Sequence, residues 1–308
     1  MTNVFKIKHF LPILFLCICS SVYGQQDPHY SQYSYNTMTA NPGYTGSRGH
    51  LAMLSLYRSQ WVGIEGSPRT ITFGIDAPIG LFNGIGLSIL QDELGPTEET
   101  YIDANYAHNL ILNRKGDRLA FGVKAGARFF SADWSKGTHL DPDPSFNENI
   151  NSKLLPTVGV GVFYYTKKGY LGLSTPNVLT SQHYNHTERV LAKERIHLFL
   201  IAGYVFDINS ELKFKPSLFV KGVSGAPISL DISANFLLFE KLHLGANYRW
   251  SDSVSALLGF QISTRFNIGY AFDYTTTPLN NFNSGTHEIF LRYQLISKLK
   301  KLRSPRFF

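Results

Sequence analysis

The chain has 308 residues, a formal net charge of +7 and two cysteines; 14% of its residues are aromatic and 17% are charged, against roughly 25% charged residues in soluble domains. The mild positive charge is too dispersed to indicate nucleic-acid binding. After the first 24 residues no apolar run reaches the roughly 20 residues that a spanning helix needs. The chain therefore lacks the pattern of a helical membrane protein.

The first residues form a predicted signal peptide. Two lysines precede the apolar run Phe10–Ile18, and small residues follow it, which is the order of charged, apolar and cleavage regions in secretory signals. We expect cleavage between Gly24 and Gln25. The alternative is an N-terminal membrane anchor, but the apolar run is too short for a spanning helix.

Both cysteines, Cys17 and Cys19, lie inside the predicted signal peptide. The mature chain is therefore expected to contain no thiol, no disulfide and no cysteine metal ligand.

From residue 50 onward, many segments alternate between apolar and polar residues with a period of two. In Arg265–Tyr274, for example, aromatic and aliphatic residues occupy every second position, and polar or small residues fill the others. Glu211–Lys221, Pro227–Leu238 and Arg118–Phe130 repeat this pattern, which predicts β-strands with one apolar face. A soluble β-sandwich has the same alternation, so this pattern alone does not identify the fold.

Strand length favours a membrane barrel. The predicted strands are longer than most soluble strands and match tilted membrane-spanning strands. Their number, about fourteen, is even, as in bacterial single-chain barrels. The predicted strand cores are 50–60, 69–77, 84–92, 99–111, 118–131, 155–166, 169–175, 195–206, 211–222, 227–238, 242–250, 254–262, 265–274 and 285–295.

The lengths of the connections support this interpretation. The even-to-odd connections are short turns, whereas Ala132–Leu154, Pro176–Glu194 and Thr275–Ser284 are long and all connect an odd strand to an even one. Outer-membrane barrels have short periplasmic turns and longer extracellular loops, and a sandwich has no reason to sort its loops in this way. We therefore predict an all-β fold: a transmembrane antiparallel outer-membrane β-barrel over residues 50–295.

Two shorter segments flank the predicted barrel. Residues 25–49 are expected to form a periplasmic or lumenal segment, and residues 296–308 a basic tail in the periplasm. Both termini are then periplasmic. The tail contains Lys298–Arg303, for which simple solvation is favoured over binding to acidic partners.

Motifs for catalysis or cofactor binding are missing from the sequence, so we expect no enzyme, no catalytic residue and no cofactor. His183 and His186 lie three apart without further metal ligands nearby. The Ala132–Leu154 loop carries a group of oxygen-bearing side chains, which calcium can bind. Two prolines interrupt the group, so an ordinary polar loop is favoured and no metal is expected. The group comprises Asp141, Asp143, Asn147 and Glu148.

Several basic residues fall on the predicted inner face. Such a lining can attract anions, but pairing with Asp103, Asp231 and Asp273 as solvated lumenal charges is the favoured interpretation. The basic residues are Lys124, Arg128, Lys213, Lys215, Lys221 and Arg265.

Three motifs follow the predicted cleavage site: Asp27-Pro28-His29-Tyr30-Ser31-Gln32-Tyr33, then Asn41-Pro42-Gly43-Tyr44-Thr45-Gly46-Ser47, then Arg58-Ser59-Gln60-Trp61-Val62-Gly63. Together they closely resemble the PorP/SprF family of type IX secretion-associated outer-membrane proteins of the Bacteroidetes. Gly43, where the family often has alanine, and the polar stretch Thr37–Thr39 depart from the pattern.

This resemblance implies a role in the type IX secretion system. Family members act with the export machinery, and some partner a secreted or cell-surface protein, often a gliding adhesin, by engaging its C-terminal sorting domain. We therefore expect this chain to assist export or surface anchoring of such a cargo. The candidate partner-binding residues are Asp27, Pro28, His29, Tyr30, Ser31, Gln32, Tyr33, Asn41, Pro42, Tyr44, Arg58, Gln60, Trp61 and Gly63.

The segment Asp27–Tyr35 has two interpretations of equal weight: an aromatic docking surface for a partner, or a plug packed inside the barrel. Two other functions remain as alternatives. One is a diffusion porin, which an open conductance would reveal. The other is an outer-membrane lipid hydrolase, for which neither His108, on an outward face, nor His197, near a strand start, has a suitable serine partner.

Overall fold

A computed structural model describes residues 33, 35–136, 149–179, 195–224 and 226–296. The predicted signal peptide and most of the predicted basic tail lie outside this part of the chain. The described strands are β1 (Leu51–Ser59), β2 (Arg69–Ile79), β3 (Asn83–Leu94), β4 (Thr97–Ile111), β5 (Arg118–Ala132), β6 (Ile150–Tyr165), β7 (Gly169–Thr175), β8 (His197–Tyr204), β9 (Phe206–Asp207), β10 (Leu212–Val223), β11 (Ser229–Leu238), β12 (Leu242–Arg249), β13 (Ser253–Gln261), β14 (Phe266–Thr275) and β15 (Thr286–Leu295).

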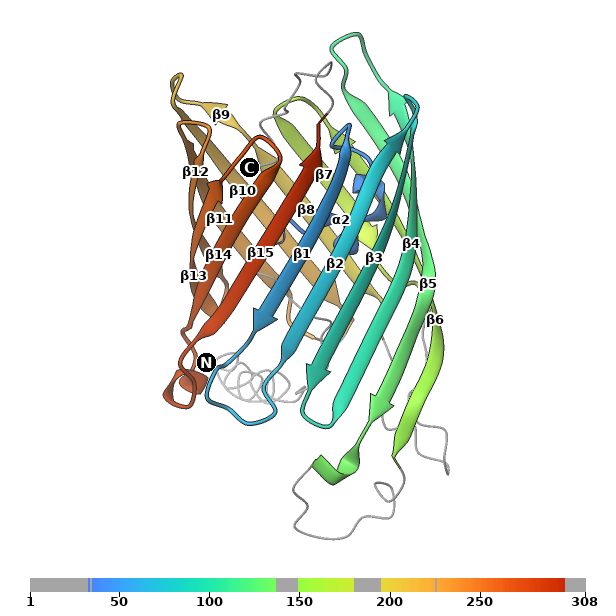
Figure 1. Cartoon of the computed structure of the whole chain (residues 1–308), viewed down its shortest axis with the longest axis vertical. Coiled ribbons are helices and arrows are strands. Elements are labelled where there is room, and N and C mark those ends of the chain that lie inside the picture. Colours follow the sequence, from blue (N-terminus) through green and yellow to red (C-terminus); the bar gives the residue numbers. More distant parts are fainter. Residues whose placement is uncertain (1–32, 34, 137–148, 180–194, 225, 297–308) are drawn as a thin grey trace, which may run out of the picture.

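The strands form a closed antiparallel barrel (Figure 1). Apart from β8 and β9, which both pair with β10, consecutive strands pair with each other. β1 pairs with β15, from Leu51 opposite Leu295 to Ser59 opposite His287. The short β9 continues β8 along the same edge of β10, so the wall has fourteen strand positions. The prediction of an all-β, 14-strand transmembrane barrel is confirmed.

A proline explains the break between β8 and β9. Pro216 in β10 has no N–H to donate to the neighbouring strand. The pairing with β10 is interrupted beside it, at residues 204–205. Val205 N instead donates to Lys168 O at 2.9 Å. The Val205 side chain is fully buried beside Leu237 on the inner face.

The predicted alternation is present in the wall. On β14, Asn267 and Asp273 are buried inside the barrel, whereas Ile268 and Tyr274 are exposed on the outside. The same division holds along the other strands, so an apolar outer face surrounds a largely polar interior, as expected of a barrel in lipid. Among the described residues, no helix combines the length and apolar character needed to cross a bilayer.

The connections are sorted between the two ends of the barrel. Antiparallel pairing places the β1–β2, β3–β4, β5–β6, β7–β8, β10–β11, β12–β13 and β14–β15 connections at one end, which is the lower end in Figure 1. The three connections predicted to be long all lie at this end. The opposite end carries short turns such as residues 80–82 and 239–241.

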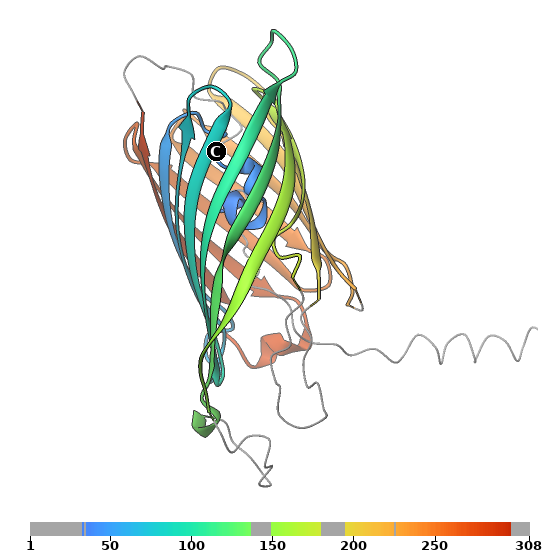
Figure 2. The ribbon, with the colours of Figure 1, turned by 90° about the vertical axis from the view of Figure 1, so that its right-hand side faces the viewer.

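A segment N-terminal to β1 lies inside the barrel. It contains the short helix α2 (Thr37–Ala40) and the 3-10 turn η1 (Pro42–Tyr44), and Figure 2 shows both enclosed by the wall. Two further 3-10 turns lie in connections at the lower end: η2 (Trp134–Lys136) and η4 (Pro278–Asn281). We call Tyr33 and residues 35–49 the lumenal segment.

Candidate functional site

Tyr33 and Tyr35 attach the lumenal segment to the wall at one side of the barrel. The Tyr33 hydroxyl lies 3.3 Å from Ser217 Oγ on β10 and 3.0 Å from Ser233 Oγ on β11. Its ring stacks on Phe219, with 5.0 Å between ring centroids. Tyr33 is therefore a buried anchor in an interior apolar cluster that also includes Phe163.

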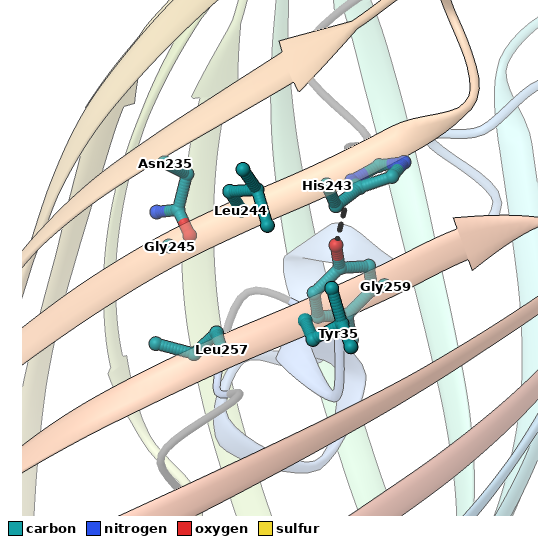
Figure 3. A pocket seen from close by; sticks show the side chains of 8 residues that line it. Tyr35, Asn235, His243, Leu244, Gly245, Leu257 and Gly259 are labelled. Carbon is teal, nitrogen blue, oxygen red and sulfur yellow. Dashed lines mark hydrogen bonds between the residues drawn. The ribbon is translucent and has the colours of Figure 1, made fainter.

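Tyr35 contacts the wall at the next strand, β12, and at β15. Its hydroxyl lies 3.0 Å from His243 Nδ1 on β12 (Figure 3), and its ring stacks on Phe290 of β15 at 4.2 Å. Beside it, Gly245 and Gly259 border a small cavity with room for about one water molecule. This cavity is too small for an organic ligand.

The turn at Asn41–Gly43 occupies a recess in the part of the wall formed by β5, β6 and β7. The recess is formed by Gly122, Gly161 and Gly172 on β5, β6 and β7, and we call these three residues the glycine recess. A Cβ atom added to any of them would come within 3.0 Å of Asn41, Pro42 or Gly43, closer than real Cβ atoms come to their neighbours. Only glycine at these wall positions allows the turn to approach so closely.

Asn41 fixes the turn in the glycine recess. Its side chain is completely buried; Nδ2 donates to the carbonyl oxygens of Val162 and Leu173 at 3.1 and 3.4 Å, and Oδ1 accepts from Gly43 N at 2.8 Å. The two carbonyls belong to β6 and β7, so one side chain connects the segment to two strands. Ser174 of β7 adds a further bond, donating to Ala40 O at 2.7 Å.

The end of the lumenal segment contacts a third part of the wall. Gly46 N donates to Asp76 Oδ2 on β2 at 2.8 Å. Met38 packs against Gly86 on β3, where an added Cβ would lie 2.5 Å from its sulfur. The segment thus crosses the interior from β10–β12 to β5–β7 and reaches β2–β3.

Replacing Asn41 with alanine is expected to loosen the segment and destabilise the protein. The substitution leaves two wall carbonyls and the Gly43 N–H without this partner, at a cost of about 1–3 kcal/mol for each buried group left unsatisfied. The effect is measured as the urea concentration at which half of the protein loses its heat-modifiable migration in gels. This concentration should be lower for Asn41→Ala than for the unaltered protein. Asn281→Ala serves as a control, because Asn281 is exposed in the 3-10 turn η4. An unchanged midpoint for Asn41→Ala would contradict the role of Asn41 in fixing the turn.

Buried ion pairs fill much of the remaining inner wall. Arg58 donates to Glu288 at 2.9 Å and pairs with Asp273 at 3.0 Å. On other strands Lys124 pairs with Asp103 at 3.3 Å, and Arg249 pairs with Asp231 at 2.8 Å. All these side chains are nearly inaccessible to solvent.

These pairs refine the expectation for the lumenal charges. Asp103, Asp231 and Asp273 are paired as predicted, but in buried contacts rather than as solvated charges. Asp231 pairs with Arg249 and Asp273 with Arg58, and the alternation identified neither arginine. Arg265 was predicted to face inward and is instead exposed in the turn before β14. Lys213 forms an ion pair with Glu240 at the strand end.

The candidate partner-binding residues fall into two environments. Tyr33, Asn41, Pro42, Tyr44 and Arg58 are buried inside the barrel. Gln60, Trp61 and Gly63 lie in the β1–β2 connection at the lower end, where Gln60 Oε1 accepts from Arg58 Nε at 3.3 Å. The remaining candidates lie outside the described residues.

Those outside candidates are the cleavage-site residues Gly24 and Gln25 and the motif residues Asp27, Pro28, His29, Tyr30, Ser31 and Gln32. The oxygen-rich group Asp141–Glu148 and the pair His183 and His186 also lie outside. The described residues contain no group of three or more His, Cys, Asp or Glu side chains that could hold a metal ion.

Both histidines considered for an enzyme are described. His108 is exposed on the outer face, with Nδ1 2.9 Å from Asn83 Oδ1. His197 is buried at the start of β8, where its carbonyl accepts from the Thr175 hydroxyl at 3.0 Å. These contacts place the two histidines in different parts of the wall.

Comparisons with known proteins give a family and a fold. The model of the type IX secretion system membrane protein PorP/SprF matches residues 22–293. A search of curated proteins gives no significant match. The CymD monoaromatic hydrocarbon channel is structurally similar, with a TM-score of 0.53 and 11% identity over 85% of this chain and 93% of that one.

The outer membrane protein Omp33 of Acinetobacter baumannii gives a lower TM-score of 0.43, with 10% identity over 80% of this chain and 100% of that one. At such low identity, the CymD similarity supports the barrel fold alone.

Proposed function

The chain belongs to the PorP/SprF family of type IX secretion system membrane proteins, and from this premise we propose that it anchors an exported cargo protein at the cell surface. The fold and the family together make it an outer-membrane barrel associated with type IX secretion. The proposed cargo carries a C-terminal sorting domain, and a gliding adhesin is one candidate. In this role the barrel receives the cargo after transport and holds it.

The lumenal segment is the observation that favours anchoring over conduction. It crosses the interior and contacts wall strands on several sides through Tyr33, Tyr35, Asn41 and Gly46. A folded cargo, or even an extended chain, needs a continuous path that these contacts obstruct. A barrel obstructed in this way is suited to binding a partner at its rim.

We further propose that both termini face the periplasm. In outer-membrane barrels the short turns are periplasmic and the longer loops extracellular. The described chain ends near the short-turn end of the barrel, at β15. The lower end in Figure 1 is then the extracellular rim.

Deleting the gene tests the secretion role. We expect one or more type IX cargo proteins to disappear from the cell surface, measured by protease shaving of intact cells followed by mass spectrometry. A copy of the gene restored at another locus controls for effects on neighbouring genes. Unchanged export and surface attachment of every type IX cargo would contradict the role.

The alternative is a general porin, which the barrel fold alone permits. Purified protein in planar bilayers is expected to give no steady conductance, because the lumenal segment obstructs the interior. A stable open-channel current from the unaltered protein would favour the porin. Inserting a known porin under the same conditions shows that the assay detects a channel.

A further inference from the structure

Two neighbouring turns are joined at the upper end of the barrel in Figure 1, opposite the three long connections. One is formed by residues 79–82, where β2 turns into β3, and the other by residues 110–118, where β4 turns into β5. Arg118 Nη1 on the second turn donates to Leu81 O on the first at 2.8 Å. We call these two segments the basic turn pair.

The apolar outer wall continues up to this pair. The outward row of β5 is apolar from Phe129 to Leu119, and ten residue steps separate these two residues. Steps of about 3.3 Å on a strand tilted by about 40° cover roughly the 25 Å of the apolar band of an outer-membrane barrel. Leu119 and Leu110, which lie directly opposite each other, therefore mark the upper boundary of this band.

Large apolar side chains cover the turns at this boundary. The Phe82 ring lies on the outer face, because it stacks beside the exposed ring of His108 with 6.4 Å between centroids. The apolar surface of the pair is thus continuous with the wall that faces lipid. Its members are between 42% and 66% exposed: Ile79, Leu81, Phe82, Leu110, Ile111 and Leu112.

Basic side chains follow directly beyond the boundary. Arg114 and Lys115 are exposed at the tip of the β4–β5 turn, which reaches furthest from the upper end in Figures 1 and 2. With Arg118, the pair contains three basic residues and one acidic residue, Asp117. The tip therefore carries net positive charge at the height where headgroups lie above an apolar band.

Asn113 holds the tip in a defined conformation. Its Oδ1 accepts from Lys115 N at 2.9 Å, and its Nδ2 donates to Asp117 Oδ2 at 2.7 Å. The one carboxylate of the pair is thus engaged within the turn. Because the tip is already ordered, its basic side chains lose less entropy when they bind a ligand.

The neighbouring turns at the upper end are different. Lys168 forms an ion pair with Asp207, and Lys213 forms one with Glu240. Their positive charges are compensated by carboxylates of the chain itself. The excess of basic over acidic residues makes the basic turn pair the better site for an external anion.

We propose that the basic turn pair binds the headgroup of an anionic phospholipid. The exposed apolar side chains contact its acyl chains, and Arg114 and Lys115 bind its phosphate, because basic residues beside an apolar surface attract anionic lipids. Lipid A carries phosphates of the same chemistry, and a phospholipid is the source to which the proposal commits. The site goes beyond the anchoring role and does not depend on it.

A tryptophan reporter tests the proposal, because the natural tryptophans, Trp61, Trp134 and Trp250, all lie at the lower end. Leu112→Trp places a reporter beside the tip. The purified protein is inserted into phosphatidylcholine vesicles that contain a small fraction of brominated phosphatidylglycerol, and bromine quenches nearby tryptophan fluorescence. We expect stronger quenching than from the same fraction of brominated phosphatidylcholine, after subtraction of the signal from the unaltered protein.

Charge removal should abolish this preference. Arg114→Gln with Lys115→Gln, in the Leu112→Trp protein, is expected to lower the preference for phosphatidylglycerol by about fivefold or more. Lys241→Gln with Arg265→Gln is the matched control, because both residues are exposed at the same end, and it should keep the preference.

A second reporter and a measurement without substitutions complete the test. Ile208→Trp, in the turn beside Asp207, is expected to show no preference for phosphatidylglycerol. Heat-modifiable migration identifies any variant that fails to fold. The unaltered protein should show a higher urea midpoint in phosphatidylglycerol than in phosphatidylcholine, so the proposal remains testable if a variant does not assemble.

The outcomes separate the possible ligands. Equal quenching of Leu112→Trp by the two brominated lipids would overturn the proposal and leave an acidic protein as the partner of the tip. Lipid A that displaces the brominated lipid more effectively than unlabelled phosphatidylglycerol would overturn the choice of a phospholipid. Neither result bears on the anchoring role, because the vesicles contain no cargo.

Discussion

Gly122→Ala is expected to push the lumenal segment away from the wall and open a conducting path. The added Cβ would collide with the backbone of Pro42 and Gly43, and backbone atoms cannot rotate aside as a flexible side chain can. The strand cannot readily move either, because β5 pairs along its length with β4 and β6. Overpacking of this kind costs about 1–3 kcal/mol.

Two measurements detect the displacement of the lumenal segment. Planar-bilayer recordings should show a current that the unaltered protein lacks. Thr45→Cys provides a second readout, because Thr45 is fully buried and both natural cysteines precede the expected cleavage site. In the Gly122→Ala background this thiol should react faster with a maleimide.

Gly222→Ala is the matched control. Gly222 also lies in a wall strand, but the nearest atom to an added Cβ is Leu198 O at 3.9 Å, so the methyl group fits. It should leave conductance and thiol reactivity unchanged. Gly122→Ala protein that is as closed and as protected as this control would show that the recess does not hold the segment.

Arg58→Met is expected to destabilise the barrel severely. Arg58 lies between Asp273 and Glu288, and both carboxylates are almost fully buried. Removing one partner of a buried ion pair typically costs about 3–5 kcal/mol, because a buried charge loses its compensation. The urea concentration that abolishes heat-modifiable migration should fall steeply.

A second substitution tests the cause. Arg58→Met combined with Glu288→Gln removes one of the two uncompensated charges and should recover part of the lost stability. Lys168→Met breaks an ion pair with Asp207 in which both side chains are well exposed, and exposed pairs contribute about 0–1 kcal/mol. If Arg58→Met is no more damaging than Lys168→Met, the buried triad does not stabilise the barrel.

The strands of the wall could be predicted from the sequence because each strand is recognisable from its own residues. Alternation along Arg265–Tyr274 depends only on which side faces lipid, and the odd-to-even position of the long loops follows from the strand order. The fourteen strand positions were therefore predictable without knowing any contact between distant residues.

The interior contacts were less predictable because they join residues far apart in the chain. Arg58 and Glu288 are 230 positions apart, and periodicity does not specify which charges meet. Within the predicted strand Arg118–Phe130, the alternation marks Gly122 only as one of the small residues between the apolar positions. Its role depends on the turn at Pro42–Gly43, which no pattern within β5 reveals. The distinctive motifs at Asn41 and Arg58 were visible, but the sequence did not show that both side chains are buried.

The position of the lumenal segment also constrains the order in which the molecule is assembled. The segment is synthesised before every strand, yet it contacts walls contributed by β2, β5, β6, β7, β10, β11, β12 and β15. The barrel closes only when β15 pairs with β1, and a segment with contacts on all these sides cannot easily be threaded into a closed cylinder. We therefore expect the strands to assemble around the lumenal segment, with the β1–β15 pairing formed last.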